Sequence, residues 1–149
     1  MDYKQSRTVL YDFGRDRFRA AALVVLGAGV VVQLRYGGVS AGDPDDGTYW
    51  ARVTRQVVDE AQETLRNGQG QRRFKSEGLV FVQLFAPRGD SKAQDNLDRI
   101  AELVRNDFRT YQNAELEFTN AAITDNVQPE PSWQRANVVS NYTYRQFIS

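Results

Sequence analysis

Two of the most versatile side chains in protein chemistry are absent from this sequence, which contains no cysteine and no histidine. Without cysteine there can be no disulfide framework, no thiolate nucleophile and no cysteine-based metal site. Without histidine the chain lacks the commonest general base near neutral pH and the commonest transition-metal ligand. Any catalysis would have to depend on carboxylates, lysine, tyrosine or serine, and we expect no cofactor and no bound metal.

An excess of charge and a long apolar run are also absent. The 19 basic residues balance the 19 acidic ones, which argues against a general nucleic-acid or anionic-membrane binder. The longest apolar stretch covers residues 20–32 and contains Gly27 and Gly29, whereas a membrane-spanning helix needs about 20 predominantly apolar residues. We therefore expect no membrane partner.

The composition that remains is typical of a globular domain. The chain has 149 residues, of which 41% are hydrophobic, 26% charged and 11% aromatic. Folding of a chain this long buries roughly 69% of the surface of the unfolded chain, which is enough for one ordinary core. We predict a single domain over residues 1–149.

The spacing of apolar residues predicts two helices and five strands. Apolar positions recur every three or four residues over 3–26, where Gly27 is a suitable terminator, and over 91–109, where Asp90 or Ser91 can cap the helix. Alternating patterns predict strands near 30–36, 49–58, 74–85, 115–124 and 136–148. The predicted class is α+β, a mixed and mainly antiparallel sheet of about five strands with two helices packed on one face.

Two connecting segments are long enough to carry function. Residues 37–47 are rich in turn formers and exceed the usual connection of about 4–6 residues. Residues 59–73 are polar and contain the turn signal Asn67-Gly68, so we predict a hairpin arm, with a short helix over 59–66 as the alternative. The strand that follows is apolar on both faces over 79–85, which predicts a central strand covered on both sides.

The acidic groups in these segments have a structural and a chemical interpretation. The loop acids Asp43, Asp45 and Asp46 do not have the alternating spacing of a calcium loop, so a solvated turn is favoured over a metal site. The acids Asp59, Glu60 and Glu63 lack the apolar neighbours that would separate the pKa values of an acid/base pair. A solvated arm is the favoured interpretation of these three.

Basic and aromatic residues next to the same segments could contact a protein partner. Arg72 and Arg73 could meet an acidic surface, although a solvated hairpin base is the alternative. Trp50 and Trp133 flank loops and could be interface residues, or each could pack on the sheet. The candidate interface residues are Asp43, Asp45, Trp50, Asp59, Glu60, Glu63, Arg66, Arg72, Arg73 and Trp133.

The order of these motifs resembles the tail-terminator (minor tail protein) family of long-tailed, lambda-like bacteriophages. The resemblance begins near Val30 and includes the run Asp43-Pro44 before Trp50-Ala-Arg-Val53. Its most specific part is Gly78-Leu-Val-Phe-Val-Gln-Leu-Phe-Ala-Pro87, and it continues through a helix opening near Ala93 to a late Trp133. The apolar segment 20–32 and the long arm depart from the usual pattern of the family.

This resemblance implies a binding protein of the virion and not an enzyme. A tail terminator forms a ring, expected to be a hexamer, that caps the head-proximal end of the tail tube, stops its elongation and joins the tail to the neck. The implied partners are further copies of the chain, the major tail tube protein and a neck or head-completion protein, with genomic DNA passing through the lumen without sequence-specific binding. Assembly in the host cytoplasm would place it at the neck-proximal end of the tail.

Three alternatives remain open at this point. A head-tail completion or neck protein of the same virion would share the size and the binding role. A small enzyme could use carboxylates such as Asp59, Glu60 or the acids of residues 43–46. A nucleic-acid-binding module would show a DNA affinity that falls steeply with salt.

Overall fold

The computed structural model describes residues 2–27, 32–36, 48–64, 72–124 and 133–148. Two helices and five strands follow one another in the predicted order of helix, three strands, helix and two strands. Their bounds are α1 (Tyr3–Leu26), β1 (Gln33–Tyr36), β2 (Trp50–Thr64), β3 (Arg72–Pro87), α2 (Ala93–Thr110), β4 (Leu116–Thr124) and β5 (Trp133–Ile148).

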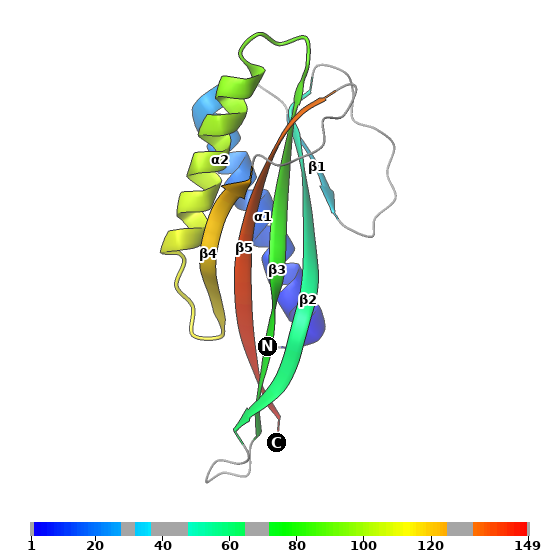
Figure 1. Cartoon of the computed structure of the whole chain (residues 1–149), viewed down its shortest axis with the longest axis vertical. Helices are drawn as coiled ribbons and strands as arrows, with labels where there is room; N and C mark the ends of the chain where they lie inside the picture. The colour runs from blue at the N-terminus through cyan, green and yellow to red at the C-terminus, as the bar shows by residue number, and fades with distance from the viewer. Residues whose placement is uncertain (1, 28–31, 37–47, 65–71, 125–132, 149) are drawn as a thin grey trace.

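All five strands form one mixed sheet in the order β1-β2-β3-β5-β4. Only the β1–β2 pair is parallel, and the other three pairs are antiparallel. The long strands β2, β3 and β5 lie side by side through the middle of the molecule, and both helices lie on the same face of the sheet (Figure 1). The predicted α+β class is confirmed.

The helices close one core against this face. Phe13 of α1 lies 4.9 Å from Phe108 of α2 and 5.1 Å from Phe118 of β4, measured between ring centroids. At Gly14 the backbone of α1 approaches β2 so closely that a Cβ would lie 2.9 Å from Val53. Glycine in a helix interior lowers helix stability, but at this position it is the residue that lets α1 pack closely on the sheet.

The two helices begin and end in different ways. Asp2 and Gln5 form a reciprocal capping box at the start of α1, and Gly27 ends this helix at a φ of 95°, in the region that favours glycine. The predicted cap of α2 is wrong, because its N-cap is Lys92, which forms no side-chain cap hydrogen bond. Asp90 instead accepts from the backbone N–H of Lys92 at 2.9 Å, so it stabilises the turn before the helix.

The strands differ from their predicted ends chiefly in length. β2 continues to residue 64 where 58 was predicted, β3 covers 72–87 where 74–85 was predicted, and β5 begins at 133 where 136 was predicted. The reason is pairing, because β3 forms an uninterrupted ladder with β5 from Arg72↔Ile148 to Pro87↔Trp133. Polar residues in these extensions do not prevent strand formation, since the neighbouring strand satisfies their backbone groups.

The remaining ends move by a few residues. β1 is described from Gln33, where a strand from residue 30 was predicted, and residues 30 and 31 lie outside the described part. α2 covers 93–110 in place of 91–109, and β4 begins at 116 in place of 115. The ends of helices and strands are defined by backbone hydrogen bonds, which the periodicity of side chains does not locate to the residue.

The central position predicted for β3 is confirmed, but its two faces are covered differently. Val80, Val82 and Leu84 point toward the helices and are fully buried. Leu79 and Phe81 lie on the opposite face and are only partly buried, because neither helix covers it. We call this second side of the sheet the open face. Within the described part of the chain, no helix is long and apolar enough to cross a membrane.

Candidate subunit interface

The three long strands extend beyond the helices and form an arm. Pairing of β2 with β3 reaches Thr64↔Arg73, and pairing of β3 with β5 reaches Arg72↔Ile148. We call residues 59–64 of β2, 72–77 of β3 and 143–148 of β5 the arm, which projects past the first turn of α1 (Figure 1). The predicted hairpin is confirmed over its described residues, and the alternative helix is wrong over 59–64. The strand predicted near 136–148 is β5, and its pairing as a third strand of the arm was not predicted.

A β-bulge marks the point where the arm leaves the body of the sheet. The register of β2 shifts between Val57 and Asp59, and the side chain of Val58 is 65% exposed. Asp59 and Glu60, both predicted interface residues, follow directly and are exposed. β1 pairs with only the first four residues of β2, so the rest of β2 is an edge of the sheet. Bulges and charged residues are features by which proteins keep such edges from pairing with other strands.

Gly78 is the residue that allows the body to join the arm. It pairs with Tyr142 of β5, and a Cβ at this position would collide with the carbonyl oxygen of Gln56 and lie 2.7 Å from the Tyr142 hydroxyl oxygen. The tyrosine ring therefore occupies the space that a side chain would fill. Burial raises the pKa of Tyr142 to about 12, although the nearby Arg55 guanidinium acts in the opposite direction.

A hollow lies beyond the N-terminal end of α1, on the side of the arm that continues the helix-covered face of the sheet. Its volume is about 320 Å³, and we call it the arm hollow. Phe74 is half-buried and contributes apolar surface, whereas Tyr144 is 2% exposed and is already packed in the core. Glu60 is exposed at this hollow and accepts a hydrogen bond from the Ser76 hydroxyl at 3.3 Å. The lining residues are Glu60, Ala61, Gln62, Phe74, Lys75, Ser76, Tyr144 and Gln146.

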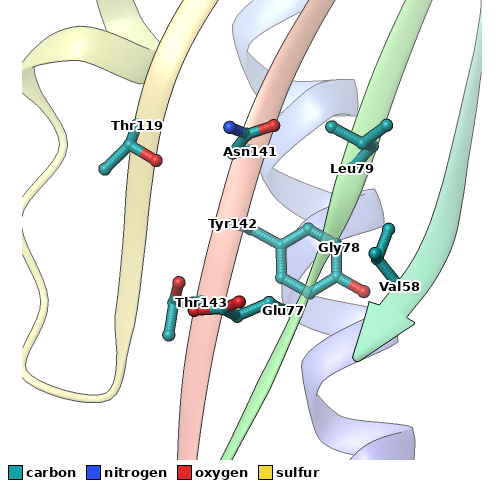
Figure 2. A pocket seen from close by; sticks show the side chains of 8 residues that line it. All are labelled: Val58, Glu77, Gly78, Leu79, Thr119, Asn141, Tyr142 and Thr143. Carbon is teal, nitrogen blue, oxygen red and sulfur yellow. The ribbon is translucent and has the colours of Figure 1, made fainter. Parts of the chain in front are cut away.

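A second hollow, of about 380 Å³, crosses four strands on the open face (Figure 2). Thr119 of β4, Asn141 and Thr143 of β5, and Glu77 of β3 supply hydroxyl, amide and carboxylate groups. The Glu77 carboxylate forms an ion pair with Lys75 at 3.0 Å. The exposed side chain of Val58 lies at the rim in Figure 2. This mixture of polar and apolar groups is suited to contact with another protein surface.

Trp50 and Trp133, although far apart in the sequence, lie together on the open face. Trp50 stacks on Phe85 with ring centroids 3.9 Å apart, and Trp133 meets Trp50 edge-on at 5.8 Å. Arg52 and Arg135 lie 5.5 and 5.4 Å from the Phe85 ring. Each tryptophan is 7% exposed, so the interpretation that they pack on the sheet is confirmed, and their role at an interface stays a prediction.

The other predicted interface residues are placed only in part. Glu63, Arg72 and Arg73 lie in the strands of the arm by their backbone, and their side chains are outside the described part. Asp43, Asp45 and Arg66 belong to segments that the structure does not describe. Among the described residues no three acidic side chains come together as a possible metal site.

A polar network that the sequence did not predict ties the far end of the sheet to α2. The Tyr49 hydroxyl donates to Asp90 at 2.6 Å and accepts from the Asn96 amide at 3.0 Å. Burial and this hydrogen bond raise the pKa of Tyr49 to about 12, and the same bond lowers the pKa of Asp90. The three residues are too far apart in sequence for spacing alone to suggest their contact.

Arg55 forms a comparable tie at the other end of the body. Its guanidinium donates to the Ser6 hydroxyl at 2.8 Å and lies 4.3 Å from the Tyr3 ring. It thereby fixes the first turn of α1 to β2 just above the arm. The helical layer ends at this contact, and the arm hollow begins beyond it.

Comparison with known proteins shows the fold but no family. No family model matches the chain, and no curated protein matches it. A solved structure that is named only by a sequence identifier is similar over 91% of this chain and 97% of its own, at 16% identity and a TM-score of 0.53. At this identity the similarity concerns the arrangement of helices and strands alone.

The geometry offers surfaces for binding. Both hollows are open and lie on or beside the arm, where side chains of both signs alternate with apolar ones. Asp59 and Glu60 point to opposite sides of β2, as successive strand residues do, so they do not form a facing pair of carboxylates. The arm and the adjoining open face thus present an extended surface of polar and apolar side chains.

Proposed function

We propose that this chain is a structural protein of a long-tailed bacteriophage virion, a tail terminator whose copies form a hexameric ring on the head-proximal end of the tail tube. The ring stops elongation of the tube and joins the tail to the neck. Its action is binding alone, without a catalytic step or a cofactor. The partners are further copies of the chain, the tail tube protein and a neck protein, and DNA passes through the lumen.

The observation that carries this proposal is the arm. Its three strands continue past the first turn of α1. Ser76 and Tyr144, next to the body, are still buried, whereas Phe74 and Gln146 farther along the arm are only partly buried. A sheet segment gains stability when a second layer covers it, and a ring or tube can supply that layer from a neighbouring copy. The sequence run Gly78–Pro87, on which the resemblance to tail terminators mainly depends, forms most of β3 in the body beside the arm.

The α+β arrangement is compatible with the proposal and does not by itself distinguish it from other binding proteins. A neck protein of the same virion would use the same kind of surfaces, and the two differ in which end of which structure they bind. The test therefore has to include the tube.

Native mass spectrometry of the purified chain over a range of concentrations is the first experiment. We expect a species of about 101 kDa, six times the subunit mass of 16.9 kDa, because head-to-tail contacts close into rings. The second step adds the chain to polymerising tail tube protein from the same phage and images the products. Capping of one tube end and arrest of growth are expected, whereas normal growth with no bound chain would contradict the proposal.

A matched variant connects the test to the arm. Deletion of residues 60–76 with a short glycine linker removes the β2–β3 part of the arm and leaves the helices and the body strands in place. Circular dichroism must show retained secondary structure before assembly is assayed. Undiminished capping by such a folded variant would mean that the arm is not the binding element.

A further inference from the structure

We infer that the arm hollow of one subunit receives the exposed C-terminal end of α1 from a second copy of the chain. This inference rests on the proposed function, because it names the contact that would join neighbours in the ring. It goes beyond that function by assigning both sides of the contact to described residues: Phe74 and Glu60 on the arm, and Arg19, Leu23 and Val24 on the helix.

The arm hollow lies where a helix would be expected and none is present in the described chain. Its apolar residues belong to the side of the sheet that α1 and α2 cover in the body, and the helical layer stops at the first turn of α1. The hollow, about 320 Å³ in volume, therefore continues the core face: Ser76 and Tyr144 are still buried there, and Phe74 is left partly exposed. The natural cover for such a surface is an amphipathic helix.

The last two turns of α1 provide such a helical surface. Leu23 and Val24 are 56% and 68% exposed, and they are among the most exposed large apolar side chains of the described residues. They lie at the opposite end of the molecule from the arm (Figure 1). Adjacent exposed apolar residues on one helix are typical of a contact site when a complementary surface exists.

The charges next to the two surfaces are complementary. Arg19 lies one turn before Leu23, is exposed, and forms no ion pair with a described residue. Glu60 is exposed on the hollow, and among the described residues its hydrogen-bond partner is the Ser76 hydroxyl. Docking of Leu23 and Val24 over Phe74 would bring these opposite charges to the rim of the contact, where they favour the correct partner.

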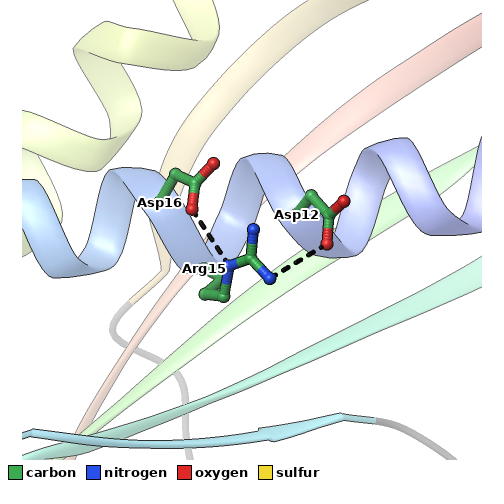
Figure 3. A network of polar contacts seen from close by, with 3 residues as sticks. All are labelled: Asp12, Arg15 and Asp16. Atoms are coloured by element: carbon green, nitrogen blue, oxygen red, sulfur yellow. Dashed lines mark hydrogen bonds and ion pairs between the residues drawn. The ribbon is translucent and has the colours of Figure 1, made fainter.

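The neighbouring charges of α1 are already neutralised. Arg15 forms ion pairs with Asp12 at 3.3 Å and with Asp16 at 3.0 Å (Figure 3). These two carboxylates are therefore engaged on the helix itself and do not oppose the approach of Glu60. Arg17 and Arg19 are the exposed basic residues that follow. Arg17 lies 5.1 Å from the Phe13 ring, and Arg19, one turn before Leu23, is the one beside the exposed apolar pair.

The placement of the two surfaces makes the contact head-to-tail. A surface at one end of the molecule binds a different surface at the other end, so each subunit retains one free site of each kind until the chain of subunits closes. Such heterologous contacts generate rings when the rotation closes and open filaments when it does not.

The absence of cysteine permits a direct test by disulfide trapping. Leu23→Cys and Gln62→Cys are combined in one chain, and the protein is oxidised at concentrations where the wild type self-associates. The two positions lie too far apart in one subunit to be bridged, since a disulfide requires Cα atoms within about 7 Å. We expect covalent multimers from the double variant and covalent dimers from a mixture of the two single variants.

Two controls isolate the contact. Each single variant alone should give no more cross-linking than random collision does, and the pair Leu23→Cys with Glu102→Cys, which moves the second thiol to the exposed face of α2, should behave in the same way. Equal cross-linking of the control pair would overturn the inference. So would a wild-type chain that stays monomeric at every concentration.

A charge exchange tests the pairing of Arg19 with Glu60. Arg19→Glu and Glu60→Arg are each expected to raise the dissociation constant of self-association about tenfold, and the double variant is expected to restore it to near the wild-type value. Sedimentation velocity measures all four proteins. Failure of the double variant to recover, with all variants folded, would mean that the two side chains do not meet.

These outcomes separate the contact from the proposed function. Rings of six copies without specific cross-linking would support the ring and overturn this contact. Specific cross-linking that yields open-ended chains with no six-membered species would support the contact and count against the ring.

Discussion

The body and the arm are built from the same three strands, yet the side chains of the two regions are buried to different degrees. In the body, Val80, Val82 and Leu84 of β3 are fully buried beneath the helices. On the same side of the same strand in the arm, Ser76 and Phe74 line an open hollow. The backbone pairing with β5 continues through both regions without interruption. The comparison shows that backbone hydrogen bonding is enough to extend a strand, whereas a covering second layer determines where large apolar side chains are fully buried.

The largest effect is expected at the junction of the two regions, from Gly78→Val. A side chain there would collide with the Gln56 carbonyl and displace the Tyr142 ring, so the free energy of unfolding should fall by about 3 kcal/mol or more. Urea denaturation measures this change. Gly89→Ala is the matched control, because a Cβ at Gly89 meets no atom within 4 Å and should leave stability unchanged. A tolerated valine at position 78 would mean that the junction is looser than the contacts indicate.

A second pair of variants compares a covered position with an uncovered one. Leu84→Ala removes a fully buried side chain of the body and should cost about 3 kcal/mol. Val58→Ala removes a side chain that is 65% exposed at the bulge and should change stability by less than about 0.5 kcal/mol. Both are measured by the same denaturation assay. A large loss from Val58→Ala in the isolated subunit would show that the arm is already covered.

Alkaline pH should destabilise the body through its buried tyrosines. The pKa values of Tyr142 and Tyr49 are raised to about 12, so the unfolded chain releases these protons first, near pH 10. The contribution of these two tyrosines to stability should therefore be constant below pH 10 and decrease between pH 10 and 12. Tyr142→Phe should flatten part of this decrease, as followed by melting temperature against pH. An unaltered slope in both Tyr142→Phe and Tyr49→Phe would contradict the assignment.

The smallest effect is expected from Asp90→Asn, at the end of the body farthest from the arm. Hydrogen bonding from Tyr49 lowers the pKa of Asp90, so the ionised carboxylate stabilises the fold above pH 4, and this contribution is lost as the pH falls through the lowered pKa. The variant should be slightly less stable than the wild type at pH 7, and the difference should shrink as the pH falls below 4. A difference that persists at low pH would assign the effect to packing.

The elements of the fold could be predicted from sequence because their signals are local. The stripe of Leu97, Ile100 and Val104 and the alternation of Ala51 and Val53 follow directly from helix and strand periodicity. The length of β2 could not be predicted in the same way. Residues 59–64 carry no apolar alternation, and their strand conformation depends on β3, which lies across a turn.

The position of the candidate interface in the sequence could be predicted, but the strands and contacts that build it could not. Asp59 and Glu60 were assigned to an arm on polarity alone, and they lie there. The third strand of the arm comes from residues 143–148, and the cover of Gly78 comes from Tyr142, both more than 60 positions away in the sequence. No spacing rule connects such residues, because only the tertiary fold brings them together. Gly78 within an apolar strand was the one visible signal, since glycine in a strand interior indicates a close approach.

The ladder between β3 and β5 also has a consequence for how the molecule folds. It joins residues 72–87 to residues 133–148, with α2 and β4 lying between them in the sequence. The hairpin of β2 and β3 can form early because it closes a short segment, whereas β5 must find its place after a long loop has closed. The body and the arm share this last strand. We therefore expect both regions to become ordered in the same late kinetic step, in the millisecond-to-second range typical of non-local strand pairing.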